Sequence, residues 1–105
     1  MNRVAASLHA EGAGRFRLQG ALTGATVAAL RQQGLQQFRH SDTETLSVDL
    51  RDVVAVDSAG LALLVDWLAW AEASGRPLQF SHLPPTLQAL AELSEVDSLL
   101  QAPAG

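Results

Sequence analysis

The sequence predicts a single α/β domain in which a mixed β-sheet of about four to five strands is covered by three to four helices. Short stretches with the period-two alternation of strands are separated by longer stretches whose apolar residues recur at helical spacing. The chain has 105 residues, enough for one domain with one continuous core. No linker, internal repeat or low-complexity tract divides it, so we expect residues 1–105 to form one domain.

Two short strands are expected near the N-terminus, over residues 4–8 and 15–18, around a Glu-Gly-Ala-Gly turn. In the second, Phe16 and Leu18 alternate with two arginines, which predicts one buried and one solvated face. Residues 27–38 form an amphipathic helix in this prediction, with glutamines on its polar face. Gly34 lies on the apolar face and allows close approach to whatever packs beneath it.

Residues 45–50 alternate with period two and predict a third strand. Arg51 and Asp52 break the alternation, and the apolar segment 53–56 then continues as an extended piece typical of a sheet centre. The remaining elements are predicted to be a helix over 61–73 closed by a glycine, a strand over 77–80, a helix over 86–94 opened by two prolines, and a turn over 96–100. Residues 101–105 are expected to be frayed.

Composition excludes several classes of function. The net charge is −4, all seven basic residues are arginines, and they form no cluster, which argues against nucleic-acid binding and against a polybasic membrane anchor. Cysteine is absent, so no disulfide or thiolate metal site is possible. No histidine pair has metal-binding spacing and no lysine-containing phosphate loop occurs, so we expect no cofactor and no metal.

The longest apolar stretch, residues 59–65, is ended by Asp66 and is far shorter than the roughly 20 residues that span a bilayer. No signal-peptide pattern opens the chain. We therefore expect a soluble cytoplasmic protein without direct membrane insertion.

The helix over 61–73 carries two apolar stripes on a helical wheel. The stripe expected to dock on the sheet consists of Leu61, Leu64, Val65 and Leu68. The stripe on nearly the opposite side consists of Leu63, Trp67 and Trp70. Because a small domain can hardly bury both faces, and because tryptophan is frequent in binding hot spots, the second stripe is a candidate partner surface. In the alternative interpretation, both tryptophans pack against a neighbouring helix of the same domain.

The tetrapeptide Asp57-Ser58-Ala59-Gly60 stands where a strand gives way to this helix. There the Ser58 hydroxyl can cap a free amide or meet a partner, and Asp57 places negative charge at the helix N-terminus. Gly60 allows close backbone approach. Taken alone, the tetrapeptide is better explained by plain helix capping than by a regulatory role.

The stretch Val-Asp-Leu-Arg-Asp-Val-Val-Ala-Val-Asp-Ser-Ala-Gly-Leu-Ala-Leu-Leu-Val, residues 48–65, resembles the signature of STAS domains, the anti-sigma-factor-antagonist fold. Residues 75–100, with their Leu-Pro-Pro segment, are similar to the closing strand and helix of that family. The first forty residues fit only in the order of their strands and helices. The resemblance implies a STAS-like mixed sheet with helices covering it.

Within the family, the Ala-Leu-Leu-Val-x-Trp helix and the Leu-Pro-Pro segment look most like the stand-alone STAS subunits of Mla-type phospholipid ABC transporters, which maintain outer-membrane lipid asymmetry. This resemblance implies a non-enzymatic subunit, peripheral to the inner membrane, that binds and stabilises or regulates the transporter's cytoplasmic MlaF-like ATPase. Ser58 matches the position that antagonist-type members present for phosphorylation. The implied partner-binding residues are Asp57, Ala59, Gly60, Leu63, Trp67 and Trp70.

One alternative within the same fold stays open at this point. The chain can instead be an anti-sigma-factor antagonist that binds a serine-kinase anti-sigma factor and is switched by phosphorylation of Ser58. A hydrolase built on Ser58 is disfavoured, because Val56 replaces the first glycine of the Gly-x-Ser-x-Gly elbow. The three histidines, His9, His40 and His82, are also scattered along the chain.

Overall fold

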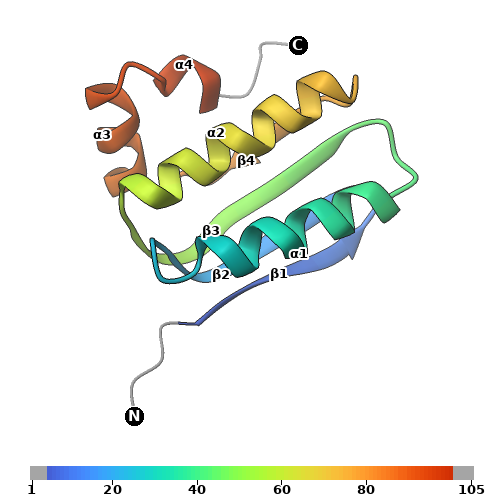
Figure 1. Cartoon of the computed structure of the whole chain (residues 1–105), viewed down its shortest axis with the longest axis horizontal. Helices are drawn as coiled ribbons and strands as arrows, with labels where there is room; N and C mark the ends of the chain where they lie inside the picture. Colours follow the sequence, from blue (N-terminus) through green and yellow to red (C-terminus); the bar gives the residue numbers. More distant parts are fainter. Residues whose placement is uncertain (1–4, 101–105) are drawn as a thin grey trace.

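The computed structural model describes residues 5–100 and confirms the predicted α/β class, with a mixed four-stranded sheet and four helices in that part of the chain (Figure 1). The elements are β1 (Ala6–Gly12), β2 (Arg15–Leu22), α1 (Val27–His40), β3 (Leu46–Val56), α2 (Ser58–Ala73), β4 (Leu78–Ser81), α3 (Pro85–Leu93) and α4 (Asp97–Leu100). The first predicted strand began at residue 4, which lies outside the described residues, as does the tail 101–105.

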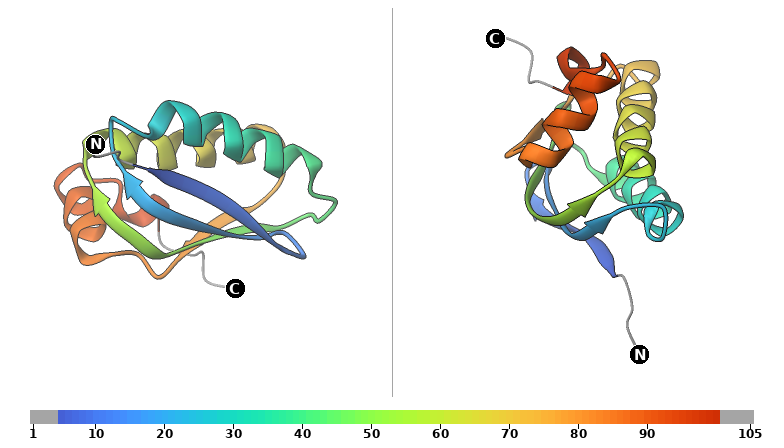
Figure 2. Two further views of the ribbon diagram at one scale, coloured as in Figure 1. Left: turned by 90° about the horizontal axis from the view of Figure 1, so that it is seen from below. Right: turned by 90° about the vertical axis from the view of Figure 1, so that its left-hand side faces the viewer.

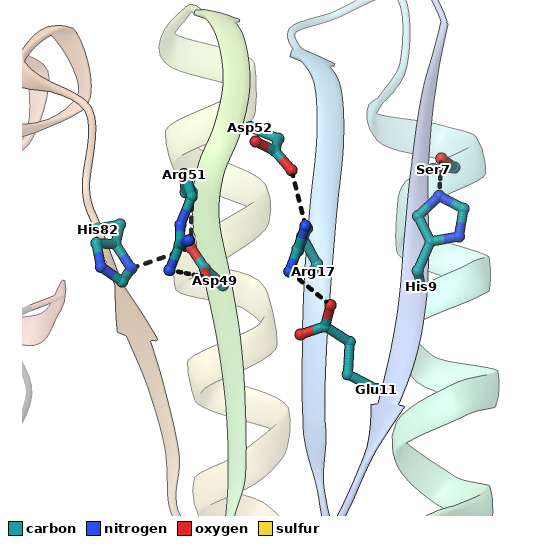
Figure 3. A network of polar contacts seen from close by, with 8 residues as sticks. All are labelled: Ser7, His9, Glu11, Arg17, Asp49, Arg51, Asp52 and His82. Carbon is teal, nitrogen blue, oxygen red and sulfur yellow. Dashed lines mark hydrogen bonds and ion pairs between the residues drawn. The ribbon is translucent and has the colours of Figure 1, made fainter.

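The sheet has the strand order β1-β2-β3-β4. β1 and β2 pair antiparallel, whereas β2 with β3 and β3 with β4 pair parallel, each parallel pair being joined through a helix. Helices α1 and α2 lie side by side over one face of the sheet, and α3 and α4 pack against α2 (Figure 2). The other face of the sheet carries charged and polar side chains (Figure 3). The apolar core therefore lies between the sheet and the α1–α2 pair.

β3 is one continuous strand, and the predicted break in its alternation at Arg51 and Asp52 coincides with a β-bulge. One extra residue of β3 is accommodated there, because the partners of β2 advance from Asp49 directly to Asp52. The bulge moves the inward-facing position from Leu50 to Val53 and keeps both halves of the strand on the core.

As predicted for residues 53–56, β3 lies inside the sheet, between β2 and β4, but this segment has a neighbour on one side only among the described residues. The pairing of β4 with β3 ends at Asp49, so the second half of β3 is paired with β2 only. Val54 lies at a second irregularity and its side chain is 81% exposed. The apolar run therefore reflects a strand end with one neighbour, not a strand buried on both sides.

The second apolar stripe of α2 is covered by α1. Leu63 is 3% exposed and Trp67 is 1% exposed, so the expectation that these two residues lie on the surface is wrong. The rings of Phe38 and Trp67 meet edge to face with centroids 5.3 Å apart, and Trp70, which is half-buried, stacks on Phe38 at 5.7 Å. The alternative interpretation, packing against a neighbouring helix, is the one the structure supports.

Gly34 is the reason that α1 can cover this stripe. A Cβ atom at position 34 would overlap the six-membered ring of Trp67, so only glycine permits the observed distance between the helices. With α1 this close, α2 buries one side on the sheet and the other on α1. A helix that is apolar nearly all round is thereby sheltered within one small domain.

The C-terminal ends of α1 and α2 are joined by Arg76. Its guanidinium donates hydrogen bonds to the carbonyl oxygens of Phe38 at 2.6 Å, Ser41 at 2.9 Å and Thr43 at 2.5 Å. A cation at the end of a helix satisfies carbonyls that have no partner within the helix and interacts favourably with its dipole. Arg76 thus fixes the α1–β3 connection against the end of α2.

We expect the substitution Gly34→Ala to destabilise the fold. Overpacking typically costs about 1–3 kcal/mol, against about 1 kcal/mol gained from the helix propensity of alanine. Because the Trp67 ring is rigid and buried, we expect a net loss of about 1–2 kcal/mol in the free energy of unfolding, measured by urea denaturation. Gly24→Ala is the control, since a Cβ there meets its nearest neighbours at an ordinary 3.9 Å. Equal unfolding midpoints for the two variants would contradict the role given to Gly34.

Candidate partner-binding site

The first turn of α2 is anchored by the carboxylate of Asp57. This residue is the N-cap of α2, and its Oδ1 accepts a hydrogen bond from the backbone N–H of Gly60 at 3.0 Å. Its Oδ2 accepts from the backbone N–H of Gly24 at 3.1 Å, in the connection between β2 and α1. One side chain therefore ties the start of α2 to the segment that leads into α1.

These hydrogen bonds stabilise the charged form of Asp57. The N–H of Gly60, followed by that of Gly24, lowers the pKa of the Asp57 carboxyl below its ordinary value. Asp57 was predicted as a partner-binding residue, and the structure assigns it a capping role within the domain. The carboxylate itself is exposed.

Gly60 is buried where α2 crosses the end of β2. A Cβ atom at this position would overlap the carbonyl oxygen of Leu22, whose same oxygen accepts a hydrogen bond from the Asp57 N–H at 3.2 Å. The expected close backbone approach at Gly60 is therefore made to β2 of the same domain. Gly60 positions the turn and does not lie on the surface.

Ser58 and Ala59 are the members of the tetrapeptide that remain accessible. Ser58 is the first residue of α2 and is exposed, while Ala59 is half-buried. Next to them a shallow groove runs between α1 and α2. Its lining residues are Val27, Ala28, Arg31, Gln32, Ala59, Ala62, Leu63 and Asp66.

Small side chains shape this groove. Ala28 on α1 and Ala62 on α2 are exposed and leave the space above Leu63 open, and an ion pair between Arg31 and Asp66 crosses it further along the helices. Sequence reasoning missed Ala28, Arg31 and Ala62, because the groove exists only once two helices lie side by side. The only trace of it in the sequence is alanine at positions that a surface helix usually gives to polar residues.

The predicted site residues therefore divide into two groups. The structure brings Ser58, Ala59 and the groove together at one end of the α1–α2 pair. Leu63 forms the floor of the groove, whereas Trp67 lies in the core and Trp70 lies half-buried near the other end of α2.

The open face of the sheet has charges that neutralise one another (Figure 3). Arg17 pairs with Glu11 at 2.9 Å and with Asp52 at 3.4 Å. Asp49 pairs with Arg51 at 3.2 Å and with His82 at 3.1 Å. Partial burial raises the pKa of Asp49, but the N–H and guanidinium of Arg51 together with His82 hold it below its ordinary value.

The histidines bond to groups other than Ser58. His9 contacts the Ser7 hydroxyl at 2.8 Å on the open face, His40 contacts the Gln36 carbonyl at 2.7 Å at the end of α1, and His82 contacts Asp49. Within residues 5–100, no cluster of three or more potential ligands is placed to hold a metal ion. In the same range, none of the helices has the length and apolar character needed to cross a bilayer.

Comparison with known proteins identifies the family. A family model described as "Mlab, STAS domain" matches residues 6–101, and the chain therefore belongs to the STAS domain family, as the sequence resemblance predicted. No curated protein sequence matches the chain at a significant level.

Two solved structures share the fold. The anti-sigma factor antagonist SpoIIAA in its unphosphorylated form has 16% sequence identity and a TM-score of 0.72, over 95% of this chain and 89% of that one. The Bacillus cell fate determinant SpoIIAA in the phosphorylated form has 16% identity and a TM-score of 0.68, over 96% and 92%. At this level of identity the similarity concerns the fold.

The carboxylate of Asp57 makes stability depend on pH. The folded-state pKa of Asp57 lies below the ordinary value of 3.8. Its contribution to the free energy of unfolding is therefore fully present above pH 3.8 and is lost as the pH falls through the lower folded-state pKa. We expect Asp57→Asn to have a lower free energy of unfolding than the wild type at neutral pH. The difference between the two should become smaller in acid, where the wild-type carboxylate is protonated. Urea denaturation over a pH series measures this.

Asp42→Asn, at an exposed aspartate in the loop before β3, is the matched control and should show no such narrowing gap. If Asp57→Asn follows the wild type at every pH, the carboxylate does not hold the two segments together.

Proposed function

We propose that this chain is a non-enzymatic STAS subunit that binds and stabilises or regulates the cytoplasmic ATPase of an Mla-type phospholipid ABC transporter. The observation that carries the proposal is the match of residues 6–101 to the MlaB-described family model. The proposed location is the cytoplasmic side of the inner membrane, reached through the partner complex.

The proposed docking surface consists of Ser58, Ala59 and the adjoining α1–α2 groove. The groove is lined largely by apolar side chains and is shallow, and the charges of Arg31 and Asp66 that cross it neutralise each other. An apolar side chain on a helix of the ATPase would fit above Leu63, with the Ser58 hydroxyl available to a polar group of the partner. Since Asp57 and Arg76 fix both helices, the surface exists before binding and little ordering is needed.

A second candidate function is that of an anti-sigma-factor antagonist. It is favoured by the exposure of Ser58 at the start of α2, where its hydroxyl is accessible to a kinase. In that role the same surface would bind a serine-kinase anti-sigma factor, and a phosphate on Ser58 would add roughly −1.5 to −2 charges beside Asp57.

Affinity purification of the full chain from its native host, followed by mass spectrometry, separates the two functions. Recovery of an ABC-type ATPase supports the transporter role. Recovery of a kinase-like anti-sigma factor supports the antagonist role and overturns the first. Incubation with activated esters tests the non-enzymatic assignment, which acylation of Ser58 would contradict.

We expect Ser58→Asp to fold normally and to bind the ATPase about tenfold more weakly, because a negative charge enters an apolar contact beside Asp57. Ser58→Ala should lose less. Ser98→Asp is the matched control, since Ser98 is also an exposed serine in the first turn of a helix, α4. Binding of the recovered ATPase is measured by calorimetry. Unchanged affinity for Ser58→Asp would remove this turn from the interface.

The groove is tested separately from the turn. Ala62→Glu places a charged side chain in the groove and should weaken ATPase binding by about tenfold or more. Ala69→Glu is the control, because Ala69 is exposed on nearly the same side of α2, two turns away, and does not line the groove. Equal affinities for the two variants would show that the partner does not enter the groove.

A further inference from the structure

The outer edge of β1 is an end of the sheet, because within residues 5–100 β1 pairs only with β2. An unpaired strand edge presents N–H and C=O groups that can pair with another chain. Proteins manage such edges by covering, charging or interrupting them. What covers this edge is therefore informative about how the chain associates with itself.

Two glutamines of α1 bond to one residue at the middle of this edge. Oε1 of Gln33 accepts a hydrogen bond from the backbone N–H of Leu8 at 3.1 Å. Nε2 of Gln37 donates one to the backbone carbonyl of Leu8 at 2.8 Å. Being four residues apart, Gln33 and Gln37 lie one helical turn apart on the same face. Together they supply the acceptor and the donor that a neighbouring strand would supply.

The orientation of the Gln37 amide follows from this strand contact. Its Oε1 is buried and has no partner among the described residues. Turning the amide over would place Oε1 against the Leu8 carbonyl, acceptor against acceptor. The contact with β1 is therefore maintained although it leaves a polar oxygen unpaired, which is unfavourable in a buried position.

Leu8 is the position that a pairing strand would need. Backbone groups of a strand alternate in direction, so Ala6, Leu8 and Ala10 present theirs to the outer edge. After Ala10 the pairing with β2 becomes irregular, so the regular part of the edge is centred on Leu8. With the Leu8 groups occupied, an incoming strand finds no two consecutive outward positions open in the described part of β1 before the irregularity.

We infer that Gln33 and Gln37 form an edge clamp that keeps β1 from pairing with a second copy of this chain. Without the clamp, two β1 edges can pair antiparallel about a two-fold axis, with Leu8 opposite Leu8 of the second copy and Ala6 opposite Ala10. Such pairing uses only backbone groups and satisfies both copies equally. The clamp does not involve Ser58 or the groove, so its test is independent of the proposed function.

The first experiment reverses the polarity of the clamp. Q33E/Q37K keeps an acceptor at position 33 and a donor at position 37, whereas Q33K/Q37E places a donor against the Leu8 N–H and an acceptor against its carbonyl. The two variants have the same composition and charge. Hydrogen exchange of the Leu8 amide, followed by NMR on the full chain, should be at least about fivefold faster in Q33K/Q37E. Equal exchange in the two variants would overturn the inference.

The second experiment removes the clamp. Q33A/Q37A should self-associate with increasing concentration in sedimentation velocity and approach the mass of a dimer. Q32A/Q36A, at two exposed glutamines of the same helix, is the matched control and should behave as the wild type. If Q33A/Q37A associates no more strongly than the control, the inference is overturned. Assemblies larger than a dimer would also overturn the inference, because two-fold pairing occupies the β1 edges of both copies. If Q33A/Q37A does not fold, the exchange comparison alone decides.

Discussion

The contact between Trp67 and Gly34 is the constraint on which the rest of this structure depends. It lets two helices lie close enough for α2 to be covered on its second side, and it fixes where α1 lies over the sheet. The position of α1 in turn places Ala28 beside Ala62 and Gln33 and Gln37 beside β1. The candidate partner surface and the covered edge of β1 are both consequences of this one approach.

The sequence was sufficient to predict the fold class and the order of the elements, although α2 begins at Ser58, three residues before the predicted start. These rest on local properties: alternation in β2 and β3, the aspartate that caps α2, and the prolines that open α3. The STAS resemblance added the family, which the family model then showed. Even the glycine in α1 was correctly expected to permit close packing, although its partner could not be named.

The errors concern features that depend on neighbours. A helical wheel gives the directions of Leu63 and Trp67 but not what stands opposite them, and here it was α1. The apolar end of β3 suggested a central strand, yet the length of β4 decided that it has only one neighbour. The groove beside Ser58 was invisible for the same reason, because its alanines come from two helices. Sequence located the tetrapeptide but not the shape of the surface around it.

The helix pair is fastened at both of its ends. At one end, Asp57 binds the segment that leads into α1; at the other, Arg76 binds the carbonyls that follow from α1 into the next loop. Both helices run in the same direction over the sheet, so one link joins their N-terminal ends and the other joins their C-terminal ends (Figure 1). A tilt imposed on α2 at Ser58 would consequently carry α1 with it and change the distance from its glutamines to β1.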